Sequence, residues 1–498
     1  MLSELGFILQ IFTPLSILIM LGGVFGGLVI GALPGLTGTM AVALLVPVTF
    51  GIQVQEALIL LVAVYIGSIS GGLVSAALLN IPGTPSSVAT TFDAYPMVQR
   101  GEAGKALGIG VFASFMGCII SFVFLVILAP LLGDFALRFG PCEYFSLVIF
   151  TLTCISSISK KLLVKGLLAA AIGMLMATVG LSEVDAIPRF TFNTELLQSG
   201  FSVMPVLIGM YAISQVMDEV KGIRTPVEVP CADFTIREFW GVAMLCLRSW
   251  KHLLRSSIIG TAIGILPGVG PGLSNIVACS QAKAADKHPE RYGTGNPDGI
   301  IASESANNAS CGGAMIPLLT LGIPGDTTTM MMLGAFMIHG VQPGPLLMRD
   351  NPDLILTILT AFLVSSVLML ILQMRFIKLL VKALSISRPV LFPIILALCT
   401  IGSFALNSNM ADVWIFFIMG IVGIVLNKLD FPLLPLVLGL ILGKMAEQEL
   451  RTSLIMGNGT LSEFLDRPIA LFFVALSLLS IAWSVYRNRK NKKGAARA

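Results

Sequence analysis

Long apolar runs, broken at intervals by short polar stretches rich in glycine and proline, make up most of this chain. Several runs contain no Asp, Glu, Lys or Arg, and each is about as long as a helix must be to cross a bilayer. These are residues 106–133, 196–217, 256–282, 354–374 and 468–486. Because the runs are continuously apolar rather than alternating, they favour helices over strands.

This pattern predicts an all-α polytopic membrane protein with about 12 transmembrane helices and several broken or re-entrant half-helices. We expect residues 11–33 to form an uncleaved first span, since no basic residue precedes this run. The interruptions should face the protein interior, because irregular backbone at membrane depth needs protein or water to satisfy its polar groups.

The interruptions occur in matching pairs. Gly31–Gly35 (GALPG) corresponds to Gly264–Gly268 (GILPG), Gly71-Gly72 to Gly312-Gly313, and residues 81–87 (IPGTPSS) to residues 323–329 (IPGDTTT). Three matches in the same order predict an internal duplication. Helix breakers at corresponding places in two membrane halves point to the substrate site of a transporter.

Loop charges orient the two copies. Basic residues at 160–165, 375–388 and 487–493 mark cytoplasmic segments, whereas the acidic loop 182–195 reads as external. The run 106–132 then starts inside and its counterpart 354–372 starts outside, which predicts inverted-topology repeats. The expected organisation is a first repeat at 1–217, a polar and amphipathic connector at 218–255, a second repeat at 256–486 and a basic cytoplasmic tail at 487–498.

Composition narrows the class of function. Only 12% of the residues are charged against 56% hydrophobic, and the basic residues flank the apolar runs instead of forming a nucleic-acid-binding stripe. The cysteines are scattered without a CxxC pair, which favours neither disulfides nor a metal site beyond a possible Na⁺ site. No P-loop, H-E-x-x-H motif or nucleophile elbow occurs, so we expect no cofactor, and a secondary transporter rather than an enzyme.

The first polar break has the chemistry of an anion site. Thr84 can cap a helix whose first residue is Pro85, and such an N-terminus directs free N–H groups and a positive dipole end at the break. Hydroxyl groups beside it suit a carboxylate. The substrate-binding residues predicted in this copy are Asn80, Gly83, Thr84, Ser86, Ser87 and Thr90.

The second copy supplies the other half of the predicted site. Its substrate-binding candidates are Asn307, Asn308, Gly325, Thr327, Thr328 and Thr329. An ionised acid near the bilayer centre costs about 2.5–3.5 kcal/mol or more, so Glu304 and Asp326 are predicted to coordinate a cation or carry a proton. Further cation-binding candidates lie in the other broken pair: Gly35, Thr37, Thr39, Gly270, Ser274 and Asn275.

Each motif also has a purely structural interpretation. Glycine and proline allow close packing and kinks in membrane helices, Asp326 can simply cap its helix, and Glu304 can pair near the interface. We expect Asp93 and Arg100 to stabilise interfacial structure, and His252, His288 and His339 show no spacing typical of ligands.

Longer motifs give the chain a family resemblance. They are Leu33–Gly35, Tyr65–Gly67, Asn80–Thr84, Phe92–Pro96 and Gly104–Gly108 in the first half, and Leu266–Gly268, Glu304–Ala309 and Leu321–Gly325 in the second. Through them the chain resembles the large membrane (TctA-type) subunit of the tripartite tricarboxylate transporters over nearly its whole length.

The resemblance implies a permease in the bacterial inner membrane. Its partners would be a small four-helix membrane subunit and a periplasmic solute-binding protein, and its substrates di- or tricarboxylates taken up by symport with Na⁺ or H⁺. The alternative function is a non-transporting membrane scaffold or receptor subunit, whose polar breaks only organise packing. An intramembrane enzyme would need acid–base pairs that the sequence does not offer.

Overall fold

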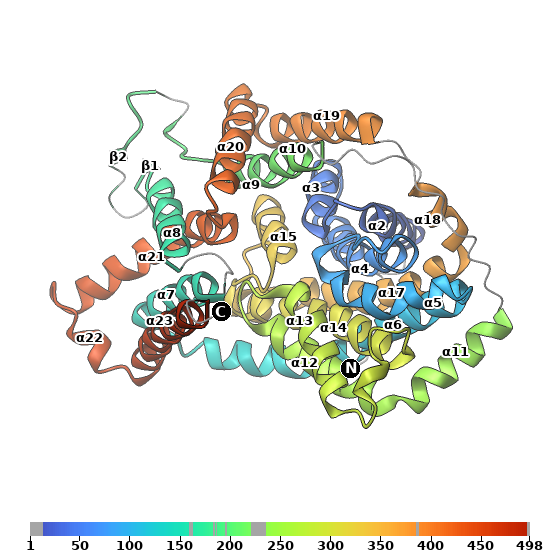
Figure 1. Ribbon diagram of the computed structural model, residues 1–498. Coiled ribbons are helices and arrows are strands. Elements are labelled where there is room, and N and C mark those ends of the chain that lie inside the picture. The colour runs from blue at the N-terminus through green and yellow to red at the C-terminus, as the bar shows by residue number, and fades with distance from the viewer. Residues whose placement is uncertain are drawn as a thin grey trace. The chain divides into compact units, whose positions relative to one another are not determined.

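The computed structural model describes residues 13–158, 163–182, 185, 187–194, 197–220, 236–384 and 388–495 (Figure 1). Within them almost all regular structure is helical, and the two strands β1 (Gly180–Leu181) and β2 (Pro188–Arg189) form a single antiparallel pair. Six described helices are long and apolar enough to cross a membrane, and six shorter apolar helices accompany them. The prediction of an all-α polytopic membrane protein is therefore confirmed.

The chain forms two compact units, and each draws on both halves of the sequence. The first unit comprises residues 1–133 and 215–406. Its elements are α2 (Pro14–Ala32), α3 (Gly38–Thr49), α4 (Val54–Leu79), η1 (Pro85–Ser87), α5 (Val88–Gln99), most of α6 (Ala103–Ala136), α10 (Ser214–Val220), α11 (Ile236–Arg248), α12 (Trp250–Ile265), α13 (Gly270–Ala285), η4 (Pro289–Arg291), α14 (Pro297–Leu321), α15 (Thr327–Ile338), α16 (Pro345–Asp350), α17 (Pro352–Arg375), α18 (Ile377–Ala383) and α19 (Arg388–Asn407).

The second unit comprises residues 134–214 and 407–498. It contains α7 (Pro141–Ile158), α8 (Leu163–Ala177), the strands β1 and β2, α9 (Val203–Ile208), the π-helical turn η3 (Gly209–Ile213), α20 (Met410–Lys428), α21 (Leu433–Met456), α22 (Ser462–Leu465) and α23 (Pro468–Ala495). Arg189 binds both carboxylate oxygens of Glu447, at 2.6 and 3.0 Å, and so ties the strand pair to α21.

Glycines bring two helices of the first unit into backbone contact with α4 and α14. A Cβ at Gly31 of α2 would strike the carbonyl oxygen of Ser68 in α4, and a Cβ at Gly264 of α12 would strike that of Ser310 in α14. Gly31 and Gly264 are partners in the internal repeat. The packing of α2 on α4 is thus repeated by α12 on α14, as a duplicated unit requires.

Two predicted spans need correction. Residues 256–282 are not one continuous helix, because α12 ends at Ile265 and α13 begins only at Gly270, across the interruption that the sequence predicted at Gly264–Gly268. Residues 196–217 also fall short, since the described helix begins at Val203 and passes through a π-helical turn. A charge-free run shows that a segment is apolar, but not that its backbone hydrogen bonds continue.

The connector predicted at 218–255 includes helical segments. Residues 221–235 lie outside the described residues, and α11 follows them as an amphipathic helix. Trp240, Met244 and Leu247 of α11 are exposed, and the side chain of Phe239 contacts Phe112 of α6. An exposed tryptophan on an amphipathic helix is typical of a helix that lies at a membrane interface.

Candidate functional site

Four helix breaks of the first unit carry the predicted site residues. Two breaks are the turns of helical hairpins, α2–α3 and α12–α13. The other two interrupt the paths from α4 to α5 and from α14 to α15. In both of these paths a residue with left-handed backbone ends the first helix: Asn80 (φ 54°) after α4 and Gly322 (φ 69°) after α14.

The helices that follow these two breaks start with the same cap. Thr84 is the N-cap before Pro85, as predicted, and Asp326 is the N-cap of α15. The N–H of Thr84 donates to Ser87 Oγ at 3.4 Å, and the N–H of Asp326 donates to Thr329 Oγ1 at 2.9 Å. Capping residue and partner are three positions apart in each copy, so the repeat extends to the capping pattern.

Each break is also held against a hairpin turn in the same way. A Cβ at Gly83 would meet the carbonyl oxygen of Gly31, and a Cβ at Gly325 would meet that of Gly264. In the second copy, the N–H of Gly268 donates to the carbonyl of Gly325 at 2.8 Å. Only glycine permits backbone to lie this close to backbone.

Hairpin α2–α3 of the first repeat meets the second repeat's break at the start of α15. We call this contact, made by Thr39, Asp326, Thr327, Thr328 and Tyr65, the α3–α15 junction. Thr39 Oγ1 donates to Thr327 Oγ1 at 2.8 Å and lies 3.4 Å from Thr328 Oγ1. Hydroxyl groups from both repeats therefore gather at two helix N-termini.

Asp326 is buried at this junction, and donors surround both of its oxygens. Oδ1 accepts from the N–H of Thr329 at 2.6 Å and from its hydroxyl at 2.8 Å. Oδ2 accepts from the hydroxyl of Tyr65 at 2.7 Å. The residue acts as a helix cap in this arrangement, and Tyr65 fixes its free oxygen.

Hairpin α12–α13 of the second repeat meets the first repeat's helix α5. We call this contact, made by Asn275, Ala89, Thr90, Ser303, Glu304 and Ser114, the α13–α5 junction. Asn275 Oδ1 accepts from the N–H of Ala89 at 2.7 Å, and its Nδ2 donates to Thr90 Oγ1 at 3.3 Å. The pairing of hairpin turn with broken helix is therefore reciprocal between the repeats.

Glu304 is fully buried at the α13–α5 junction. Its Oε1 accepts from the hydroxyl of Thr90 at 2.5 Å and its Oε2 from the hydroxyl of Ser114 at 2.9 Å. No Lys or Arg lies within ion-pair distance of it among the described residues. Hydroxyl groups can either donate or accept, so this site suits the charged and the protonated carboxyl alike.

The remaining predicted residues take different positions. Asn307 and Asn308 are fully buried but face apart, since Asn307 Nδ2 donates to the carbonyl of Ile69 in α4 and Asn308 Nδ2 lies 3.6 Å from Cys118 Sγ in α6. The side-chain oxygen of each has no hydrogen-bond partner in the described part of the chain. Ser86 is hydrogen-bonded to Thr84 at 2.7 Å.

The turn predicted to bind a cation through unwound backbone is shorter than expected. Ser274 and Asn275 already lie in α13, and Ser274 Oγ donates to the carbonyl of Pro271 at 2.9 Å. Gly270, with a φ of 66°, packs against the Cβ of Asp326. At the first hairpin, the carbonyl of Gly35 accepts from the amide of Gln215.

The sequence analysis missed four residues of these contacts: Tyr65, Ser114, Ser303 and Gln215. Tyr65 and Ser114 donate to Asp326 and Glu304, Ser303 accepts from Thr90, and Gln215 accepts from Thr37 in the first hairpin. Tyr65 stands in a motif that carries the family resemblance, and Ser303 directly precedes Glu304. Both positions could therefore have indicated a role in the site. Ser114 gave no such indication, because it is a single polar residue in an apolar run, and Gln215 stands in no motif that was singled out.

Asp93 and Arg100 stabilise a loop, and their location at a membrane interface stays a prediction. Asp93 Oδ1 accepts from the backbone N–H groups of Gly293, Gly295 and Asn296, and Arg100 donates to the carbonyl of Gly295 at 2.8 Å. Both residues therefore order the segment between α13 and α14.

His252 has partners that its sequence spacing did not predict. Donor atoms of His252, Asp286 and Asp298 lie within 4.8 Å of one another. Asp298 Oδ1 has no hydrogen-bond partner among the described residues, but the other two groups have partners: His252 Nδ1 contacts the guanidinium of Arg255, and the N–H of His288 donates to Asp286. This N–H lowers the pKa of Asp286. We interpret the cluster as the polar base of hairpin α12–α13.

Comparison with known proteins covers most of the chain. Residues 17–438 match the family model described as "Tripartite tricarboxylate transporter TctA family". An uncharacterized 52.8 kDa protein of the TAR-I ttuC' 3' region of Agrobacterium vitis is 33% identical over 488 residues, which is 97% of this chain and 95% of that protein. An uncharacterized protein of the TAR-II ttuC' 3' region of the same organism is 35% identical over 234 residues, 47% of this chain and 97% of its own length. No solved structure matches the chain.

Proposed function

Because the chain belongs to the tripartite tricarboxylate transporter TctA family, we propose that it is a secondary active permease that imports di- or tricarboxylates in symport with Na⁺ or H⁺. The family is one of membrane transporters whose systems comprise several subunits. On this proposal, a periplasmic solute-binding protein delivers the substrate, a small four-helix membrane subunit completes the system, and the protein resides in the bacterial inner membrane.

The reciprocal contact between the repeats is the observation that carries this proposal. It brings the N-termini of α3 and α15 together through Thr39 and Thr327, and joins α13 to the first turn of α5 through Asn275 and Ala89. Helix N-termini and hydroxyl groups bind carboxylates without a membrane-buried Lys or Arg. We place the substrate between these N-termini, with Thr84, Ser86 and Ser87 from one repeat and Thr327, Thr328 and Thr329 from the other.

Glu304 is the residue that we assign to cation coupling. A fully buried carboxylate without a basic partner is costly in the ionised form, so a proton or a Na⁺ ion would stabilise it. Hydroxyl oxygens of Thr90 and Ser114 and the unpartnered side-chain oxygens of Asn307 and Asn308 belong to the same buried region around α14. A multiply charged anion also needs accompanying cations to enter against a negative-inside potential.

Uptake by proteoliposomes containing the chain and its two partner subunits tests the proposal. With a Na⁺ or H⁺ gradient imposed, we expect accumulation of labelled citrate or succinate. Ser86→Ala and Asn308→Ala should each reduce it, whereas Gly22→Ala should not, because Gly22 has no atom near its missing side chain. Near-normal transport in both polar variants would reject these site residues.

Counterflow separates this function from the scaffold alternative. Vesicles preloaded with unlabelled citrate should take up labelled citrate transiently if the chain forms a transport path. A scaffold or receptor subunit would bind its partners but give no counterflow with any carboxylate, and that result would overturn the proposed function.

A further inference from the structure

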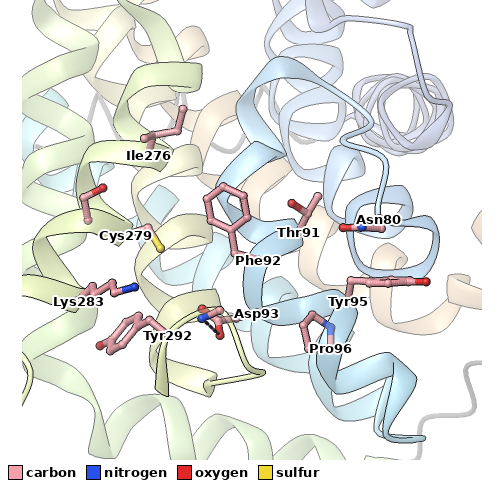
Figure 2. A pocket seen from close by; sticks show the side chains of 12 residues that line it. Asn80, Thr91, Phe92, Asp93, Tyr95, Pro96, Ile276, Cys279, Lys283 and Tyr292 are labelled. Atoms are coloured by element: carbon pink, nitrogen blue, oxygen red, sulfur yellow. Dashed lines mark hydrogen bonds between the residues drawn. The ribbon is translucent and has the colours of Figure 1, made fainter. Parts of the chain in front are cut away.

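A crevice of about 640 Å³ opens in the first unit between α5 and α13. Figure 2 shows Thr91 and Phe92 on the α5 side, opposite Ile276 and Cys279 of α13. Asn80, which ends α4 at the first repeat's break, also lines the crevice. Its walls therefore come from both repeats, as do the two sides of the α13–α5 junction.

The inner end of the crevice lies next to the α13–α5 junction. Ile276 follows Asn275, whose Oδ1 accepts from the N–H of Ala89, and Thr91 follows Thr90, which donates to Glu304. Further along the two helices, Thr91 to Pro96 on the α5 side and Ile276 to Lys283 on the α13 side contribute residues to the lining of the crevice. Two residues that line the crevice, Ile276 and Thr91, are thus the sequence neighbours of Asn275 and Thr90, which make the hydrogen bonds of the junction.

Charge at the outer end favours an anion. Lys283 is the one cationic side chain among the described residues that line the crevice, and it is exposed. Asp93 is the one acidic residue there, and three backbone N–H groups of the following loop already hold its Oδ1. These N–H groups offset the charge at Oδ1 of Asp93, although its Oδ2 has no hydrogen-bond partner among the described residues. The exposed side chain of Lys283 extends from α13 toward the crevice (Figure 2), where an arriving anion would meet it.

Asn275 occupies the position that a substrate carboxylate would take. Its side-chain oxygen caps an N–H in the first turn of α5, at 2.7 Å, and a carboxylate oxygen is a stronger acceptor for such a group. An arriving anion can displace the amide without leaving the N–H unpaired. The amide thus closes the inner end of the crevice when no substrate is bound.

We propose that the crevice between α5 and α13 is the route by which the carboxylate reaches and leaves the first turn of α5, with Lys283 attracting it at the mouth and Asn275 closing the inner end. This inference rests on the proposed function. It assigns a conducting role to the contact between the repeats. The mouth lies toward the end of α5 that precedes the run 106–132, which the charge pattern predicts to start on the cytoplasmic side.

Kinetics of Lys283→Gln against Lys287→Gln test the mouth. Lys287 is also exposed but does not line the crevice, so the two variants lose the same charge from neighbouring surfaces. In counterflow, Lys283→Gln should raise the apparent KM for citrate about threefold to tenfold, while Lys287→Gln leaves it within twofold. Equal KM values in the two variants would overturn the role of Lys283.

A cysteine at Ser280, which is exposed and lines the crevice, tests the path itself. Vesicles carrying Ser280→Cys, treated with a membrane-impermeant anionic thiol reagent, should be labelled from the cytoplasmic face. Citrate should slow the labelling at least twofold in an active transporter. Labelling unaffected by citrate, or only from the external face, would reject the route.

Asn275→Ala tests the inner end. Removing the competing acceptor should lower the apparent KM for citrate, because the Ala89 N–H becomes free for substrate. A raised KM would mean that Asn275 binds substrate directly and would overturn its role as the closing group. If the unmodified protein transported no carboxylate at all, the proposed function would be wrong. If it transported carboxylates but the variants behaved otherwise than expected, only the route through the crevice would be wrong.

Discussion

The α3–α15 and α13–α5 junctions are related by the internal repeat, yet they hold their carboxylates differently. Asp326 at the first is bound by a backbone N–H, a threonine hydroxyl and the hydroxyl of Tyr65. Glu304 at the second accepts hydrogen bonds from the hydroxyls of Thr90 and Ser114. A backbone N–H can only donate, so it favours the ionised form of the carboxyl group that it binds, whereas hydroxyls adapt to either form.

This contrast separates a carboxyl group that caps a helix, Asp326, from one that can be either ionised or protonated, Glu304. The backbone pattern is similar at both junctions, but both acids come from the second repeat and stand at different places in it. Asp326 sits at the N-cap, where the first copy has Thr84, whereas Glu304 sits within α14, where no cap is needed. On the proposed function, we therefore expect Asp326 to act as a cap and Glu304 to exchange the cation.

The largest effect that would sharpen this contrast is expected from Glu304→Gln. The amide cannot lose a proton or neutralise Na⁺, so stimulation of carboxylate uptake by the cation gradient should fall at least about tenfold. Asp326→Asn is the matched variant and should retain most of the stimulation. Uptake at varied Na⁺ concentration and pH measures both, and a larger loss in Asp326→Asn would reverse the assignment.

A second, smaller effect concerns stability. Asp326→Ala removes the cap of α15 and the acceptor of the buried Tyr65 hydroxyl, at an expected cost of about 2–3 kcal/mol. Asp326→Thr copies the residue of the first repeat and should recover at least half of that loss. Thermal unfolding of the purified protein in detergent provides the comparison, and equal destabilisation by both substitutions would contradict the capping role.

Helix contacts shared by the repeats provide a third test. Gly31→Ala and Gly264→Ala place a methyl group against a backbone carbonyl of α4 and α14 respectively, so each should destabilise the protein by about 1–3 kcal/mol. Gly22→Ala is the control on α2, since nothing lies within 4 Å of its missing Cβ. Similar melting temperatures for all three variants would show that the close approach is not needed.

The smallest predicted effect is at the contact between the repeats. Thr39→Val keeps the shape of the side chain but removes the hydrogen bond to Thr327, which should cost about 0.5–1.5 kcal/mol. A double-mutant cycle with Thr327→Val isolates that interaction. Strictly additive effects would mean that the two hydroxyls do not stabilise the α3–α15 junction.

Local chemistry made parts of the site predictable from the sequence. The cap at Thr84 and the start of α15 at Thr327 follow from a few adjacent residues, because helix starts depend on near neighbours. The duplicated breaks could be recognised for the same reason, since Pro and Gly act on their own backbone. The class of fold followed from the apolar runs.

Hydrogen-bond partners that lie far apart in the sequence could not be predicted from local patterns. Tyr65 and Asp326 are 261 positions apart, and Ser114 and Glu304 are 190 apart. Periodicity shows that Ser114 lies in an apolar helix, but does not show which other helix its hydroxyl faces. The facing of Asn307 and Asn308 in opposite directions depends likewise on how α4 and α6 pack around α14.

The burial of α14 has a consequence for how the protein is made. Nearly all of its residues are buried, including Glu304, Asn307 and Asn308, and it is not among the helices apolar enough to span a membrane by composition. Such a segment does not partition from the translocon into lipid by itself. We therefore expect α14 to insert together with neighbouring helices. These are α12 and α13, which directly precede it in the chain, and α4, which is synthesised earlier.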